Sequence, residues 1–158
     1  MKLVYLIVAA ALVVVLAWVY KSGALNLGGS SGYKQATVVI RGEQFRVDVA
    51  DTMGKRELGL GGREPLVADG GMLFIFPSVA NRRFWMKDVS FPIDIIWISG
   101  DRIVGFAKEA QPQGDIPLHQ LTHYRSPEAV DRVLEVASGT VDRVGMMLGD
   151  GVNVKLED

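Results

Sequence analysis

From residue 33 onward, hydrophobic side chains occur in short runs that are separated by turn-forming residues. Within one run, Phe45, Val47 and Val49 alternate with polar residues, and this spacing of two predicts a strand with one face in the core. The segments predicted as strands are 36–40, 44–49, 71–76, 91–98, 102–107, 131–137 and 152–156. The first two flank the turn at 41–43, which predicts a β-hairpin.

Two other segments favour short helices. Asp51 or Thr52 is suited to cap a helix over 53–60, and Ser138 is suited to cap a helix over 139–147. A βαβ sheet would need longer helices between its strands. The pattern therefore predicts a mainly β domain, either a compact β-sandwich or a partly closed barrel, with two short helices.

One polar residue interrupts a strand that is otherwise apolar on both faces. The segments 71–76 and 91–98 have the continuous apolar character of strands buried on both sides, except for Asp94. A carboxylate on such a face is costly unless it has a partner. Asp94 is therefore either a structural residue, satisfied by backbone N–H groups or by a base such as Arg63 or Lys87, or the floor of a ligand site.

The N-terminal segment is apolar enough to cross a membrane. Residues 3–20 carry no charge and are flanked by Lys2 and Lys21. As a helix they would span roughly 27 Å, close to the hydrocarbon thickness of a bilayer. Residues 1–21 are therefore predicted to be an N-terminal hydrophobic helix, either a retained signal-anchor or a signal peptide cleaved near the small residues 22–24.

A Gly/Ser-rich linker at 22–32 follows this segment and precedes the globular domain at 33–158. With a retained anchor, the protein is a single-pass membrane protein whose domain lies outside the cytoplasm. With a cleaved signal peptide, the domain is periplasmic or secreted. In the first case the membrane itself is a partner, through the N-terminal helix.

Composition excludes several classes of function. The segment 33–158 has 15 basic and 18 acidic residues, a balance that argues against sequence-independent binding of nucleic acid. The absence of cysteine excludes disulfides, thiol nucleophiles and thiolate metal sites. No P-loop, nucleophile elbow or dinucleotide-binding glycine motif is present, so no cofactor is indicated and no catalytic residue can be named.

Three further residues are candidates for a site. Trp85 and Lys87 precede the strand of Asp94 and could stack on a ligand and orient its polar groups. Glu135 lies within an apolar strand and could form a carboxylate pair with Asp94 for acid/base chemistry, if the two face one cleft. The alternative is that Trp85 covers a sheet edge and Glu135 makes a structural ion pair.

A metal site is a weaker hypothesis. His119 and His123 have the spacing of helical metal ligands, but the surrounding segment lacks helical periodicity and reads as a loop. Methionine sulfurs could bind Cu(I), although Met146 and Met147 look like helix packing. We therefore predict no metal ligands. The neighbouring Arg82 and Arg83 are predicted to form a solvated turn.

The chain resembles the family known as domain of unknown function 192. The matching runs are 56–63, 71–76, 84–88, 92–96, 133–136 with Gly139, and 149–150, in the family's order. The Gly-Met-Leu-Phe run together with Phe-Trp-Met-Lys is specific to it. Gly61, Asp88 and Val89 depart from the family's usual residues.

The resemblance implies a compact β-sandwich-like fold, often behind a signal or anchor segment, with no established activity or cofactor. It singles out the polar and aromatic motif positions, which are Arg63, Trp85, Lys87, Asp94 and Glu135. The preferred hypothesis is an extracytoplasmic binding or interaction module for a small ligand or an envelope protein. The alternatives are an enzyme acting on envelope or extracellular carbohydrate and a metal-handling protein.

Overall fold

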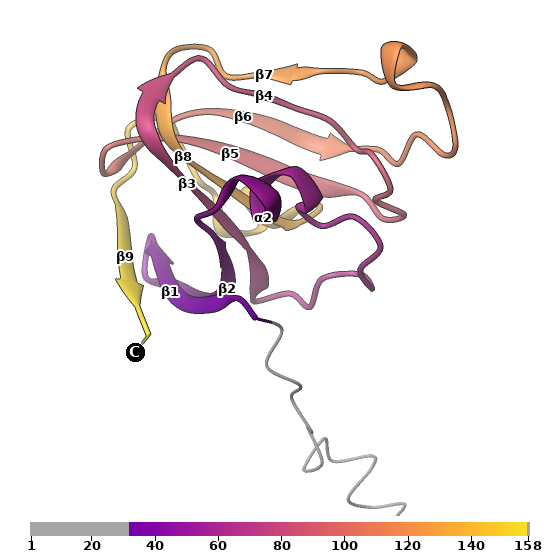
Figure 1. Ribbon diagram of the computed structural model, residues 1–158. Helices are drawn as coiled ribbons and strands as arrows, with labels where there is room; N and C mark the ends of the chain where they lie inside the picture. Colours follow the sequence, from indigo (N-terminus) through magenta and orange to yellow (C-terminus); the bar gives the residue numbers. More distant parts are fainter. Residues whose placement is uncertain (1–31, 158) are drawn as a thin grey trace, which may run out of the picture. The chain divides into compact units, whose positions relative to one another are not determined.

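Seven strands form one mixed sheet in the order β6-β5-β8-β3-β2-β1-β9 (Figure 1). The computed structural model describes residues 32–157, and the predictions for 1–21 and most of 22–32 lie outside them. No helix of this described part is long and apolar enough to cross a membrane. The strands of the sheet are β1 (Lys34–Ile40), β2 (Glu43–Ala50), β3 (Gly70–Ala80), β5 (Ile93–Ser99), β6 (Arg102–Ala110), β8 (Val130–Ala137) and β9 (Val152–Leu156).

All neighbouring strands are antiparallel except β2 and β3, which are parallel. The predicted hairpin is confirmed: β1 and β2 are joined through Arg41 and Gly42, whose φ angles of 52° and 85° suit the tight turn of a hairpin. All seven predicted strands are present, and β3 and β6 run several residues beyond the predicted ends. The fold is therefore mainly β, as predicted.

The two edge strands of the sheet, β6 and β9, are joined at one end. Arg102 and Gly151 form an antiparallel bridge. Next to it, the Ile103 N–H donates to the Asp150 carbonyl at 3.0 Å, and the Val152 N–H donates to the Asp101 carbonyl at 2.7 Å. These bonds occupy backbone groups that an open sheet edge would leave unpaired.

The two faces of the sheet carry separate hydrophobic cores. One core contains alternate residues of β1, β2, β5 and β8, including Val38, Phe45 and Ile96, together with Val141 of the helix α3 (Thr140–Val144). The other contains Met72, Phe74, Ile95, Trp97 and Val133, covered by Leu60 and Met86 from the connecting segments. A strand between the two cores is buried on both faces, which explains the continuous apolar runs of β3 and β5.

Asp94 lies on the face of the first core, where backbone N–H groups bind its carboxylate. It is fully buried, and it shares a face with Ile96 and Ile98 as predicted. Its Oδ1 accepts from the Glu109 N–H at 2.8 Å and its Oδ2 from the Val141 N–H at 2.9 Å. Backbone donors therefore satisfy the carboxylate and tie β6 and α3 to β5.

The predicted basic partners of Asp94 are wrong. Arg63 forms an ion pair with Asp48, and Lys87 forms one with Asp88. The physical reason is that Asp94 points into the first core, where nearby backbone N–H groups already occupy both carboxylate oxygens.

Both predicted helices are present but shorter than expected. α2 (Met53–Leu58) begins after Thr52, whose hydroxyl accepts from the Lys55 N–H as predicted, and it ends at Gly59, with φ 54°, before the predicted end at residue 60. α3 begins after Gly139, which has a left-handed φ of 80° and makes no side-chain cap, so the predicted Ser138 cap is wrong. Glycines in positive-φ conformations set these ends.

A second sheet of two very short strands was not predicted. β4 (Arg83–Phe84) pairs with β7 (Tyr124–Arg125), and Figure 1 shows them running together. The Arg82 N–H donates to the Ser126 Oγ, and the Ser126 N–H donates to the Arg82 carbonyl, both at 2.9 Å. The chain between these strands contains the 3₁₀ helix η1 (Leu118–Gln120). Strands of two residues are too short for alternation to reveal.

Asp94→Ala is expected to lower the free energy of unfolding by about 3 kcal/mol, because it leaves two backbone N–H groups near the first core without an acceptor. Urea denaturation measures the change. Asp101→Ala is the control, since the Asp101 side chain is 84% exposed and its ion pair with Arg102 should contribute less than about 1 kcal/mol. Equal losses in both variants would contradict the structural role of Asp94.

Candidate functional site

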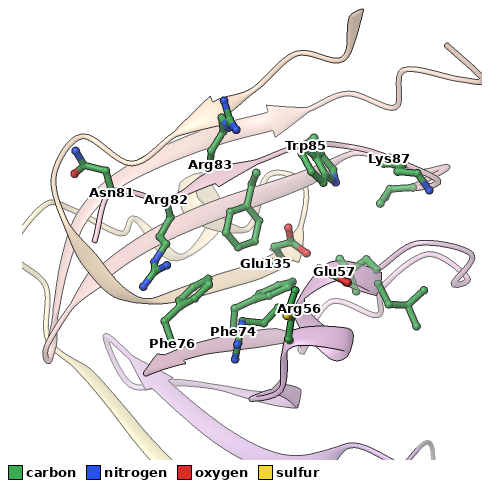
Figure 2. Close-up of a pocket in the computed structure, with 16 residues that line it drawn as sticks. Arg56, Glu57, Phe74, Phe76, Asn81, Arg82, Arg83, Trp85, Lys87 and Glu135 are labelled. Atoms are coloured by element: carbon green, nitrogen blue, oxygen red, sulfur yellow. The ribbon is translucent and has the colours of Figure 1, made fainter. Parts of the chain in front are cut away.

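A pocket of about 360 Å³ opens on the sheet face that carries the second core. It is bordered by α2, β3, β4 and β8, so segments far apart in the sequence meet there. Its lining combines aromatic rings, cationic side chains and one buried acid (Figure 2). The lining residues are Met53, Arg56, Glu57, Leu58, Gly59, Leu60, Phe74, Phe76, Asn81, Arg82, Arg83, Phe84, Trp85, Lys87, Val89 and Glu135.

The aromatic part of the pocket is a packed cluster around Phe84. Its ring meets Phe74 edge-on with centroids 4.8 Å apart and Trp97 at 5.4 Å. Trp85 is 41% exposed and meets the His123 ring at 5.7 Å. Such edge-to-face contacts fix ring orientations, so this part of the pocket is a formed apolar surface.

Glu135 is the buried acid of the pocket. On β8 it lies between Met72 of β3 and Ile95 of β5, and it is only 4% exposed. Among the residues that the structure describes, its carboxyl group makes no hydrogen bond and no ion pair. Figure 2 shows Glu135 in the middle of the lining residues, with Trp85 and Lys87 to one side and Arg82 and Phe76 to the other.

Burial raises the pKa of Glu135 from its ordinary value of 4.5 to about 8. At neutral pH the group is then mainly a neutral carboxylic acid, which can both donate and accept a hydrogen bond. A carboxyl group kept neutral in an apolar site can serve as a hydrogen-bond donor to a bound molecule or as a general acid.

Two arginines flank one ring of the pocket. The guanidinium carbons of Arg82 and Arg56 lie 3.9 Å and 5.3 Å from the centroid of Phe76. Arg56 donates to the Ile75 carbonyl at 2.9 Å, and Arg82 donates to the Ser78 carbonyl. Burial, and secondarily the charge of Arg56, lower the pKa of Arg82. Cationic groups are thus held against an aromatic surface.

The structure brings together three of the five predicted site residues. Trp85, Lys87 and Glu135 line the pocket, whereas Arg63 and Asp94 do not. Arg63 is ion-paired with Asp48 and its guanidinium lies 4.7 Å from the Tyr33 ring centroid.

The predicted carboxylate pair is wrong. In the register of β5 and β8, Ile95 is the partner of Glu135, while Asp94 is the partner of Val136. Adjacent residues of a strand point to opposite faces, so Asp94 and Glu135 belong to different cores and cannot face one cleft.

Sequence reasoning missed Arg56 and Arg82 as site residues. Arg82, predicted to be solvated, is half-buried against Phe76, whereas Arg83 is exposed. The sequence did contain a hint that these two arginines belong to the site. Arg56 begins one of the family's motif runs, and Arg82 lies two residues before another. Their common contact with Phe76 depends on the tertiary fold and could not be read from spacing.

The histidines are not arranged as helical ligands. His119 lies in η1 and His123 in the following loop, against Trp85. Within residues 32–157, no three His, Cys, Asp or Glu side chains are grouped so that they could hold a metal ion.

Comparison with known protein families finds one family model that matches most of the chain. The sequence profile of DUF192, described as Uncharacterized ACR, COG1430, matches residues 36–154, which confirms the resemblance inferred from the motif runs. No curated protein is significantly similar to the chain.

Two solved structures are similar to this one. A candidate transcription regulator of Sinorhizobium meliloti 1021 is 29% identical, with a TM-score of 0.68 over 77% of this chain and 95% of its own. A protein of unknown function from Novosphingobium aromaticivorans DSM 12444 is also 29% identical, with a TM-score of 0.69 over 79% of this chain and 89% of its own.

The pKa of Glu135 predicts an unusual pH dependence of stability. Between its ordinary value of 4.5 and about 8, the folded chain holds a proton that the unfolded chain has lost. The free energy of unfolding should therefore fall as pH rises through this window, by at most about 1.4 kcal/mol per pH unit. Glu135→Gln should remove this component, so the variant gains stability relative to the wild type from pH 5 to pH 8. Urea denaturation of the wild type and of Glu135→Gln at pH 5 and pH 8 measures this difference. If the stability of both proteins changed equally between the two pH values, a buried, unpaired Glu135 would be contradicted.

Proposed function

The chain belongs to the DUF192 family, and we propose that its domain is a binding module that takes a small, partly apolar ligand in the Glu135 pocket. The observation that carries this proposal is the contrast between the two buried acids. Asp94 has a backbone donor on each oxygen, whereas Glu135 has no partner among the described residues and faces a formed pocket.

Energetics favour a functional role for Glu135. The Glu135 carboxyl group is largely removed from water, which raises its pKa to about 8, and no described residue offsets this desolvation with a hydrogen bond. In the same sheet, Asp94 has a backbone N–H donor on each carboxylate oxygen, so this fold can satisfy a buried acid. A residue that lowers stability in a pocket is typical of a site where a ligand completes the hydrogen bonds.

The lining indicates the kind of ligand. Phe74, Phe84 and Trp85 provide apolar surface, and the neutral Glu135 carboxyl can bond to one polar group. A volume of about 360 Å³ is at the lower end of the range for small-molecule sites. These features suit a molecule about the size of a substituted aromatic ring.

The alternative functions have less support. A carbohydrate enzyme using Asp94 and Glu135 would need both carboxyl groups in one cleft, and they lie on opposite faces of the sheet. A metal-handling role through His119 and His123 has less support, because no three His, Cys, Asp or Glu side chains within residues 32–157 are grouped so that they could hold a metal ion. A role in transcription regulation, the description given to the Sinorhizobium protein, has less support here, because the segment 33–158 has more acidic than basic residues, which argues against sequence-independent binding of nucleic acid.

We further propose that the sheet, joined at its β6 and β9 edges, is a partly closed barrel. We also propose that this domain lies outside the cytoplasm. The uncharged segment 3–20 supports this location. Protease added to intact spheroplasts should digest the full chain, whereas a variant without residues 1–21 should stay protected in the cytoplasm. Protection of the full chain would contradict the proposed location.

Blocking the pocket tests the binding function. Leu58 lines the pocket and is 61% exposed, and Val79 is equally exposed but does not line it. Leu58→Trp should place an indole in the pocket and weaken binding of small aromatic fragments at least about tenfold, while Val79→Trp leaves binding unchanged. Fragment titrations followed by ¹⁵N NMR measure the affinities. Fragments that perturb only residues outside the pocket, or that bind Leu58→Trp normally, would contradict the proposal.

A further inference from the structure

The lining of the pocket has more basic than acidic residues, although the domain at 33–158 has more acidic than basic residues. Among the lining residues, the basic groups are Arg56, Arg82, Arg83 and Lys87, and the acidic groups are Glu57 and Glu135. Glu135 is mainly neutral at pH 7, because its pKa is about 8. Lys87 is already paired with Asp88, so the arginines supply the charge that is left for a ligand.

Arg56 and Arg82 are fixed in place without an acidic partner. Neither makes an ion pair among the described residues, and each donates to a carbonyl of β3 instead. Both guanidinium groups also lie against Phe76. A carbonyl bond and a ring contact hold each group in one orientation, so little side-chain entropy remains to be lost when a ligand binds.

The two guanidinium groups still have unused hydrogen-bond donors. Each guanidinium carries five N–H donors, and the Nε of Arg82 is buried with no partner in the described part of the chain. A buried donor without an acceptor is uncommon in a native protein and requires an explanation. A ligand acceptor between the two groups would bond to the guanidinium N–H donors that the carbonyl bonds leave free.

The positive charges of Arg56 and Arg82 also favour a bound anion. The pKa of Arg82 is lowered by burial and by the positive charge of Arg56, so the two groups repel each other. An anion bound by both would offset this repulsion, and planar guanidinium groups bind carboxylates and phosphates with paired hydrogen bonds.

We propose that Arg56 and Arg82 form the anion-binding end of the pocket, and that the ligand is a small organic anion, an aromatic or otherwise apolar body carrying a carboxylate. This assignment rests on the proposed function of the pocket and specifies the ligand's charge. The apolar body would lie along the aromatic cluster, and Glu135 would donate to or accept from a second polar group of the ligand.

The test compares two probes that differ in charge. Phenylacetate and phenylacetamide have the same ring and nearly the same size, but only phenylacetate is an anion at pH 7. Isothermal titration calorimetry is run with the full-length chain in phosphatidylcholine nanodiscs at low salt, with empty nanodiscs as the blank. Phenylacetate should bind at least about tenfold more tightly than phenylacetamide, and added sodium chloride should reduce this preference.

Variants identify the residues responsible. Arg56→Gln and Arg82→Gln should each remove most of the preference for phenylacetate. Arg102→Gln is the matched control, because Arg102 is 69% exposed and lies outside the pocket, and it should leave the preference unchanged. If a pocket variant fails to fold, the preference of the wild-type chain and its salt dependence still decide the question.

Each outcome has a distinct meaning. Equal binding of the two probes would overturn the anion site and leave the binding pocket standing. If Arg102→Gln lost as much of the preference for phenylacetate as Arg56→Gln and Arg82→Gln, the anion site would also be overturned. The preference would then come from the overall charge of the chain. Binding of neither probe would overturn the anion site as well, and the fragment titrations with Leu58→Trp would then decide whether the pocket binds any ligand.

Discussion

The alternation of side chains along two neighbouring buried strands, β5 and β8, determines which face of the sheet each of the two buried acids enters. Because adjacent residues point to opposite faces, Asp94 enters one core and Glu135, opposite Ile95, enters the other. A shift of one residue in this register would turn over one of the two strands and place both acids on the same face of the sheet. Asp94 is placed where the backbone N–H groups of Glu109 and Val141 satisfy it, and Glu135 is placed at a pocket where no described residue does.

Much of the fold could be predicted because the strands are long enough to show their period. The hairpin, the seven strands of the sheet and the face occupied by Asp94 follow from alternation and from apolar runs. The helix ends could not be read in the same way. They depend on the backbone conformations of Gly59 and Gly139, and other glycines nearby in the sequence were equally plausible. The pairing of β4 with β7 depends on contacts between distant segments, which a two-residue strand does not encode.

The candidate site was predicted in part, and the errors have a common origin. Trp85, Lys87 and Glu135 do line one pocket, but Arg63 and Asp94 do not. Asp94 is a candidate because it interrupts an apolar strand, Arg63 is a candidate as its partner, and both also match the family motif. Membership of a motif does not distinguish a residue that holds the fold from one that faces a ligand. That distinction depends on hydrogen-bond partners, which are satisfied for Asp94 and missing for Glu135. The arginines at Phe76 were missed for the same reason, since their isolation from acidic partners is a property of the folded chain.

We infer that Glu135 is a buried acid without a partner among the described residues, held neutral in a ligand pocket. Its side-chain carboxyl carbon reports the protonation state directly, and Glu135→Gln identifies the signal. We would follow this resonance by ¹³C NMR from acidic to alkaline pH in the folded chain. We predict a midpoint near 8, because burial disfavours the charged carboxylate. A midpoint at or below the ordinary value of 4.5 would show a solvated or paired carboxylate, and would contradict the account.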